Sequence, residues 1–81
     1  MSLQTEKLQI ESKIAILLKE RAGEELKVEM NIIAIRQEAS PLFKPEEIDV
    51  EKLSLAVSEL SKSIDRIRSI DLEVAKYKRL L

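Results

Sequence analysis

Apolar residues recur with helical spacing along most of this chain, beginning with a stretch from residue 3 to residue 39 that contains no proline. At about 100° per residue, its apolar positions form two adjacent ridges on one broad face. The first ridge consists of Leu3, Ile10, Ile14, Leu17, Val28, Ile32 and Ile35. The second ridge consists of Leu8, Ala15, Leu18, Ala22, Leu26 and Ile33. The pattern predicts one helix over about residues 3–39. Because one companion helix covers only a narrow stripe, we expect this helix to need at least two neighbours.

The middle of this first helix is polar between Lys19 and Lys27 and holds the chain's only glycine, Gly23. Glycine inside a helix costs about 1 kcal/mol relative to alanine. No proline follows, and no Ser, Thr, Asp or Asn stands where a second helix would need its first cap. We therefore predict that the helix is continuous through Gly23.

A proline-bounded segment, from Ser40 to Pro45, interrupts the helical pattern. Each proline lacks a backbone donor and disfavours helical geometry in the residue before it. The sequence predicts a turn over residues 40–49, with a short turn of its own just after Pro45. Leu42 and Phe43 are expected to fold back and close one end of the assembled protein.

A second helix is predicted over about residues 50–80, and Asp49 is expected to cap its first amides, at Glu51 and Lys52. Its apolar residues recur four and three positions apart, which is a heptad pattern typical of coiled coils. They are Leu53, Val57, Leu60, Ile64 and Ile67, followed by Ile70, Val74, Tyr77 and Leu81. The three-residue step from Ile67 to Ile70 reads as a stammer that shifts the pattern around the helix.

Together these patterns predict an all-α protein with a single domain over residues 1–81, built as an antiparallel hairpin of two long helices. A lone hairpin would leave part of the broad face of the first helix in water, so we expect two copies to complete a four-helix bundle. The predicted dimer and bundle core contains Ile10, Ile14, Leu17, Leu18, Leu26, Ile33, Leu53, Val57, Leu60, Ile64, Ile67 and Val74.

The composition excludes several kinds of chemistry. There is no Cys and no His, which removes zinc sites, iron–sulfur clusters, redox dithiols and triads with a histidine base. The serines are read as caps, turn residues and polar helix faces; they are Ser2, Ser12, Ser40, Ser54, Ser58, Ser61 and Ser63. A lone Gly23 cannot form a phosphate-binding loop. We expect no enzyme activity, no cofactor and no bound metal.

Four charged side chains of the first helix lie between its two apolar ridges: Arg21, Glu25, Glu29 and Arg36. In an assembled bundle they are candidates for a polar layer that sets register and oligomeric state, as polar core residues do in coiled coils. Two other interpretations stay open. The four residues can be solvent-exposed at the edge of the bundle, or they can form a functional polar pocket.

The overall charge does not favour an anionic partner such as a nucleic acid or an acidic membrane. The chain has 14 basic and 15 acidic residues, for a net charge of −1. Basic residues concentrate late in the second helix, at Lys62, Arg66, Arg68, Lys76, Lys78 and Arg79, but acidic residues are interleaved with them. No apolar run is long enough to span a membrane, and the N-terminal residues lack a signal-peptide pattern. We therefore expect a cytoplasmic protein without membrane association, and nucleic-acid binding is not favoured.

Residues 10–21, IESKIAILLKER, resemble the opening helix of the all-helical chorismate mutases. That family also needs an arginine well upstream of the helix arginine and a lysine downstream of it. Gln4 and Ile32 occupy those places here, so the chain is not assigned to the family. The two-helix layout is also similar to that of the small Rop-type RNA-binding hairpin, a likeness of fold without a shared motif.

The leading functional hypothesis is a small non-catalytic protein–protein interaction module, an adaptor, chaperone or regulator, that homodimerises and binds another protein not identifiable from the sequence. The alternative is a nucleic-acid-binding regulator of Rop-like layout that uses the late basic residues of the second helix.

Overall fold

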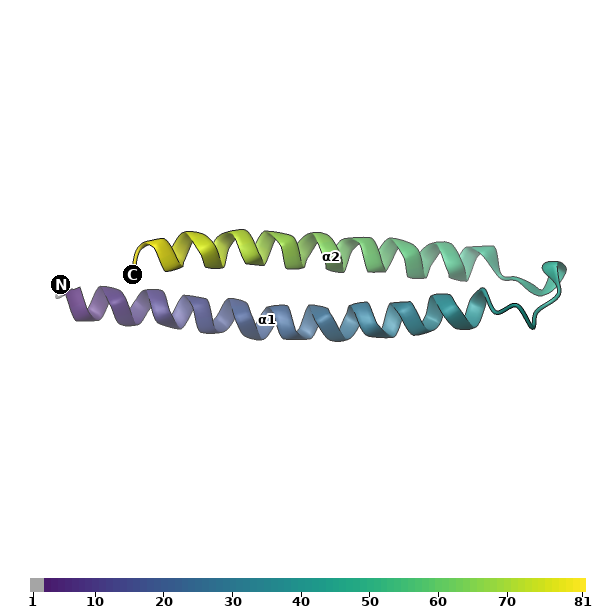
Figure 1. Cartoon of the computed structure of the whole chain (residues 1–81), viewed down its shortest axis with the longest axis horizontal. Coiled ribbons are helices and arrows are strands. Elements are labelled where there is room, and N and C mark those ends of the chain that lie inside the picture. Colours follow the sequence, from purple (N-terminus) through teal and green to yellow (C-terminus); the bar gives the residue numbers. More distant parts are fainter. Residues whose placement is uncertain (1–2) are drawn as a thin grey trace.

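A computed structural model describes residues 3–81 as two long helices joined by a short connection. Helix α1 spans Leu3–Glu38, the 3-10 helix η1 spans Pro45–Glu47, and α2 spans Val50–Arg79. The two long helices lie antiparallel along their length, with both ends of the chain at the same end of a rod of 65 × 15 × 14 Å (Figure 1). The predicted all-α hairpin is confirmed, and α1 continues through Gly23 without a break.

Local polar contacts shape the connection between the helices. The backbone N–H of Leu42 donates to Ser40 Oγ (3.3 Å), and that of Phe43 donates to the Ser40 carbonyl (3.1 Å). At the start of α2, Asp49 Oδ1 accepts from the backbone N–H of Lys52 (3.1 Å), which satisfies one of the unpaired amides of the first turn. The predicted Asp49 cap is therefore present at Lys52.

Helix α2 faces α1 along an unbroken heptad, which we call the α2 seam. It consists of Leu53, Ala56, Leu60, Ser63, Ile67, Ile70, Val74 and Tyr77, all buried or half-buried. The steps alternate three and four without interruption, so the stammer expected at Ile67 is not needed. Ala56 and Ser63 take the places that the apolar pattern had given to Val57 and Ile64. Ser63 is only 4% exposed, which corrects its reading as a residue of a polar face.

Helix α1 presents a matching heptad, the α1 seam, which shares Ile10, Ile14, Leu17, Val28 and Ile35 with the first ridge and has Asn31 in place of Ile32. It consists of Ile10, Ile14, Leu17, Arg21, Glu24, Val28, Asn31, Ile35 and Glu38, all buried or half-buried. Apolar side chains dominate the half near the chain ends, and polar ones recur from Arg21 onward. The large buried apolar side chains are therefore concentrated in the half near the chain ends.

The best-buried cluster lies in that half. Ile70 is fully buried and packs with Ile14, Leu17 and Val74, while Ile10 and Tyr77 pack at the edge. Lys13 Nζ lies 5.4 Å from the centre of the Tyr77 ring, a cation–π contact.

Within the single chain, the twelve predicted core residues divide into three groups. Buried are Ile14, Leu17 and Val74; half-buried are Ile10, Leu53, Leu60, Ile64 and Ile67; exposed are Leu18, Leu26, Ile33 and Val57. Phe43 and Leu42 are also exposed at the tip of the hairpin, so their role in closing an end of a bundle stays a prediction for the assembled protein.

Candidate interaction surface

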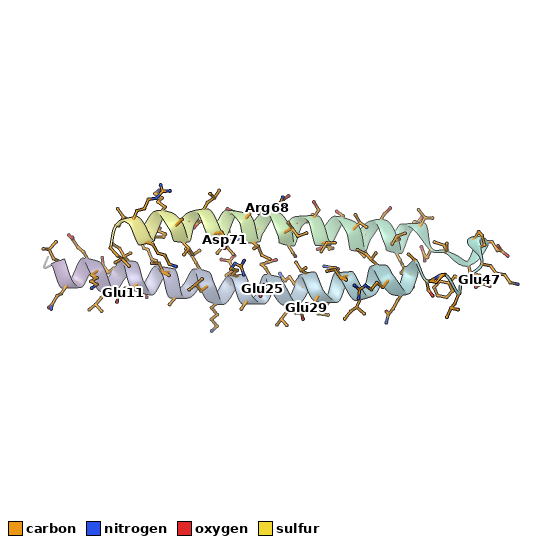
Figure 2. The ribbon with its side chains drawn as sticks, viewed as in Figure 1. Glu11, Glu25, Glu29, Glu47, Arg68 and Asp71 are labelled. Atoms are coloured by element: carbon orange, nitrogen blue, oxygen red, sulfur yellow. The ribbon has the colours of Figure 1, made fainter. Side chains whose placement is uncertain are left out.

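A polar layer crosses the middle of the hairpin, where the α1 seam changes from apolar to polar. Arg21 Nε donates to Asp71 Oδ1 across the helix pair (2.8 Å), and the same guanidinium pairs with Glu25 one turn along α1. Figure 2 labels Asp71 on α2 and, farther along the rod toward the tip, Glu25 on α1. The layer thus links the two helices through one arginine.

A second arginine ties the helices together on the other side of the seam. Arg66 of α2 donates through Nε and Nη2 to the two carboxylate oxygens of Glu20 at 2.7 and 2.8 Å, a bidentate pair. It also lies 3.6 Å from Glu73 on its own helix. Because arginine and carboxylate match as two planar forks, this contact fixes the register of α1 against α2 more specifically than a single charge pair would.

These contacts change the ionisation of the groups that make them. The pKa of Glu20 is lowered from its ordinary 4.5, chiefly by its hydrogen bonds from Arg66, and the nearby positive charges add to the shift while desolvation opposes it. The pKa of Asp71 is lowered from 3.8, chiefly by its hydrogen bond from Arg21. The pKa of each arginine is raised by the same contacts. Both carboxylates are therefore ionised at neutral pH, as the ion pairs require.

Two of the four residues predicted to form a polar layer, Arg21 and Glu25, meet in this arrangement, and the other two, Glu29 and Arg36, do not. Glu29 and Arg36 are exposed along α1, nearer the tip (Figure 2 labels Glu29). Sequence reasoning did not find Asp71 and the pair Glu20–Arg66. The sequence does contain a signal for charge pairing at Glu20 and Arg66. Each residue lies directly beside a seam residue, and the flanking positions of coiled coils commonly carry charge pairs between helices.

The two flanks of the helix pair differ in chemistry. Positions seven apart share a strip of a helix surface, so the Glu20 strip also carries Lys13 and Lys27, and the Arg66 strip carries Glu59 and Glu73. We call this the charged flank. On the opposite side, the Leu18 strip carries Ile32 together with Glu11 and Glu25, and the strip of Asp71 on α2 carries Val50, Val57 and Ile64. This second side holds more apolar residues than the first, and we call it the apolar flank.

The second ridge of α1 extends the apolar flank around the outside of the helix. All its members are exposed, and Leu8 and Leu26 retain 65% and 61% of their accessible surface. Helix α2 covers the first ridge of α1 from Ile10 onward, whereas the second ridge stays exposed to solvent. Contiguous exposed apolar surface of this kind usually marks an interaction site. The apolar flank with the second ridge is therefore the candidate functional surface.

Three basic residues of α2 are engaged in ion pairs with acidic residues, whereas Lys76, Lys78 and Arg79 near its C-terminal end form no ion pair within residues 3–81. Lys62 lies 3.6 Å from Glu59, Arg68 lies 3.8 Å from Asp65, and Arg66 holds Glu20. Acidic side chains thus interrupt the basic stripe along the helix surface. Such a mixed surface does not concentrate positive potential as a phosphate-binding stripe would.

Two searches of the described residues, 3–81, bear on other kinds of site. No group of three or more acidic side chains there is arranged to hold a metal ion. Over the same residues, neither helix has a stretch long and apolar enough to cross a membrane.

The fold and the exposed flank thus define a helical hairpin with an unpartnered apolar surface. In comparisons with known proteins, no family model, no curated protein and no solved structure matches the chain.

Proposed function

We propose that the protein is a small non-catalytic interaction module that homodimerises through its apolar flank into a four-helix bundle and then binds another protein with its outer surface. The observation that supports this proposal is the second ridge, which stays exposed when α1 packs on α2 and which adjoins exposed Val57 and half-buried Ile64 of α2. A second copy of the chain presents the same apolar surface, so a two-fold symmetric interface can cover both copies at once.

The weak core of the single hairpin also favours assembly. Only Ile14, Leu17, Ala56, Ile70 and Val74 are buried hydrophobic residues among those described, and four of them form one cluster in one half of the rod. Chains of this size gain little stability from a single core and commonly need disulfides, metals or association. With no cysteine available, association remains.

The polar layer supports a structural role rather than catalysis. Arg21 and Arg66 each hold carboxylates in ion pairs, and these pairs involve Asp71, Glu25 and Glu20. Groups occupied in this way orient one helix on the other. An adaptor, chaperone or regulator acts by binding its partner, and two helices held in a fixed orientation are sufficient for that role. We propose that the protein acts in the cytoplasm.

Sedimentation equilibrium tests the dimer directly. The expected mass is twice the 9.3 kDa of one chain. Leu26→Glu places a charge in the proposed interface and is expected to give monomers, whereas Leu72→Glu, at an exposed apolar position on the outside of α2, is expected to leave the dimer intact. A stable wild-type monomer would refute the proposal, and a trimer would show that the proposed oligomeric state, a dimer, is wrong.

Salt dependence separates this proposal from the nucleic-acid alternative, which receives less support because Lys62, Arg66 and Arg68 pair within the chain. Binding of a labelled RNA hairpin through several phosphates would weaken steeply, by about a thousandfold or more between 50 and 200 mM salt. The interaction module is expected to bind no such probe even at low salt. Salt-sensitive binding of that size would replace the proposal with the alternative.

A further inference from the structure

The second ridge of α1 has a small side chain at its middle. Ala22 lies between Leu18 and Leu26 on this ridge and is exposed. A small side chain lets the backbone of another helix approach closely. Gly23 follows Ala22, but consecutive residues of a helix point about 100° apart, so Gly23 faces away from the ridge. Ala22 is therefore the place on this face where a second helix can approach most closely.

The surface of α1 is arranged symmetrically about Ala22. Leu8 lies fourteen residues before Ala22 and Arg36 lies fourteen residues after it, which is about 21 Å in each direction along the helix. Each end carries an open hollow. One is lined by Leu8 with Gln4, Lys7 and Glu11, and the other, of about 480 Å³, by Arg36 with Ile33, Gln37, Ser40, Leu42 and Phe43.

We infer that in the dimer the two α1 helices cross antiparallel at Ala22, so that the hollow lined by Arg36 and Phe43, which we call the tip hollow, receives Leu8 of the other copy. This inference rests on the proposed dimer and specifies its geometry. The tip hollow is apolar and its Phe43 is partly exposed, as expected of a site that a second copy completes. The same contact covers Leu8, which is otherwise one of the most exposed members of the second ridge.

Charge distinguishes the antiparallel arrangement from a parallel one. Parallel packing of α1 on α1 would set Glu11, Glu29 and Arg36 each beside its own copy, which places like charges together at three levels. The antiparallel crossing instead brings Arg36 within one helical turn of the level of Glu11 in the other copy. Neither of these two residues has an ion-pair partner among residues 3–81. Each is therefore available to the other across the interface.

Cysteine crosslinking tests the geometry cleanly because the chain contains no cysteine of its own. A disulfide needs two Cα atoms within about 7 Å. Ala22→Cys lies at the proposed axis and is expected to oxidise to a covalent dimer, while Ser58→Cys, exposed on α2, is the control expected to stay uncrosslinked under the same conditions. Leu8→Cys is expected not to crosslink with itself, because antiparallel helices hold the two copies about 42 Å apart at 1.5 Å per residue. Mixed with Arg36→Cys, it is expected to form the heterodimeric disulfide.

A charge exchange provides a second readout. Glu11→Arg and Arg36→Glu alone are each expected to weaken dimerisation by roughly three- to tenfold, since each change turns two symmetry-related attractions into repulsions. The double variant is expected to recover to within about twofold of wild type.

The outcomes separate the geometry from the dimer itself. A wild-type chain that sediments as a monomer overturns the dimer and the crossing together. A dimer in which Leu8→Cys crosslinks with itself, or in which Ala22→Cys does not crosslink, overturns the antiparallel crossing and leaves the dimer standing. A double charge variant no better than the two single ones also overturns the pairing of Arg36 with the other copy's Glu11.

Discussion

Replacing Ile70 with alanine tests the packing of α2 on α1 at its best-buried point. Ile70 has no exposed surface, and its side chain contacts the cluster of Ile14, Leu17 and Val74. The change removes three carbon atoms, worth about 2.4 kcal/mol at about 0.8 kcal/mol for each buried carbon. A cavity adds to this cost, but the neighbours lie at the edge of a thin rod and can partly close over it. We therefore expect a loss of about 3 kcal/mol, within the range of about 2–5 kcal/mol for such changes.

Urea denaturation followed by circular dichroism measures this loss. With a slope of about 1.5 kcal/mol per molar urea, the midpoint is expected to fall by about 2 M. Variant and wild type need the same protein concentration, because dimerisation would make apparent stability depend on it. Leu72→Ala is the matched control on the same helix: Leu72 is exposed in the single chain, and its loss is expected to stay below about 0.5 kcal/mol. Equal losses at Ile70 and Leu72 would refute the register described here.

Three further predictions concern the seam, the charges and the helix start. Ser63→Ala, at a buried seam position, is expected to raise the urea midpoint by the equivalent of about 0.5 kcal/mol through helix propensity, and a lowered midpoint would mean that the hydroxyl stabilises the interface. Because the pKa of Glu20 and that of Asp71 are lowered by folding, their contribution is complete above the ordinary value of 4.5 for Glu20 and is lost as pH falls through the lowered value. Melting curves of Glu20→Gln are therefore expected to show a smaller loss of stability in acid than wild type, and an unchanged acid loss would contradict the ion-pair account. Asp49→Ala removes the acceptor for the amide of Lys52 and is expected to cost about 1 kcal/mol in the same urea assay, whereas no change would show that water replaces the cap.

Much of the fold was determined by local sequence features. Pro41 and Pro45 disfavour a helix in the connecting segment whatever the tertiary structure is. Asp49 can cap only the helix that follows it. The lengths of α1 and α2 and the short connection between them then leave an antiparallel pair as the simple arrangement. The breadth of the apolar face of α1 also follows from periodicity alone, and its second ridge is the surface left exposed.

The tertiary structure decided which strip of each helix faces the other. Two overlapping heptads are present in α2, one through Val57 and Ile64 and one through Ala56 and Ser63. Hydrophobicity favours the first, but the second is the one that packs on α1, with small side chains where the helices meet. The ion pairs between the helices could not be predicted from the sequence either, because Arg21–Asp71 and Glu20–Arg66 join residues that lie far apart in sequence. Periodicity describes one helix at a time, whereas register is a property of two helices, and only their packing determines it.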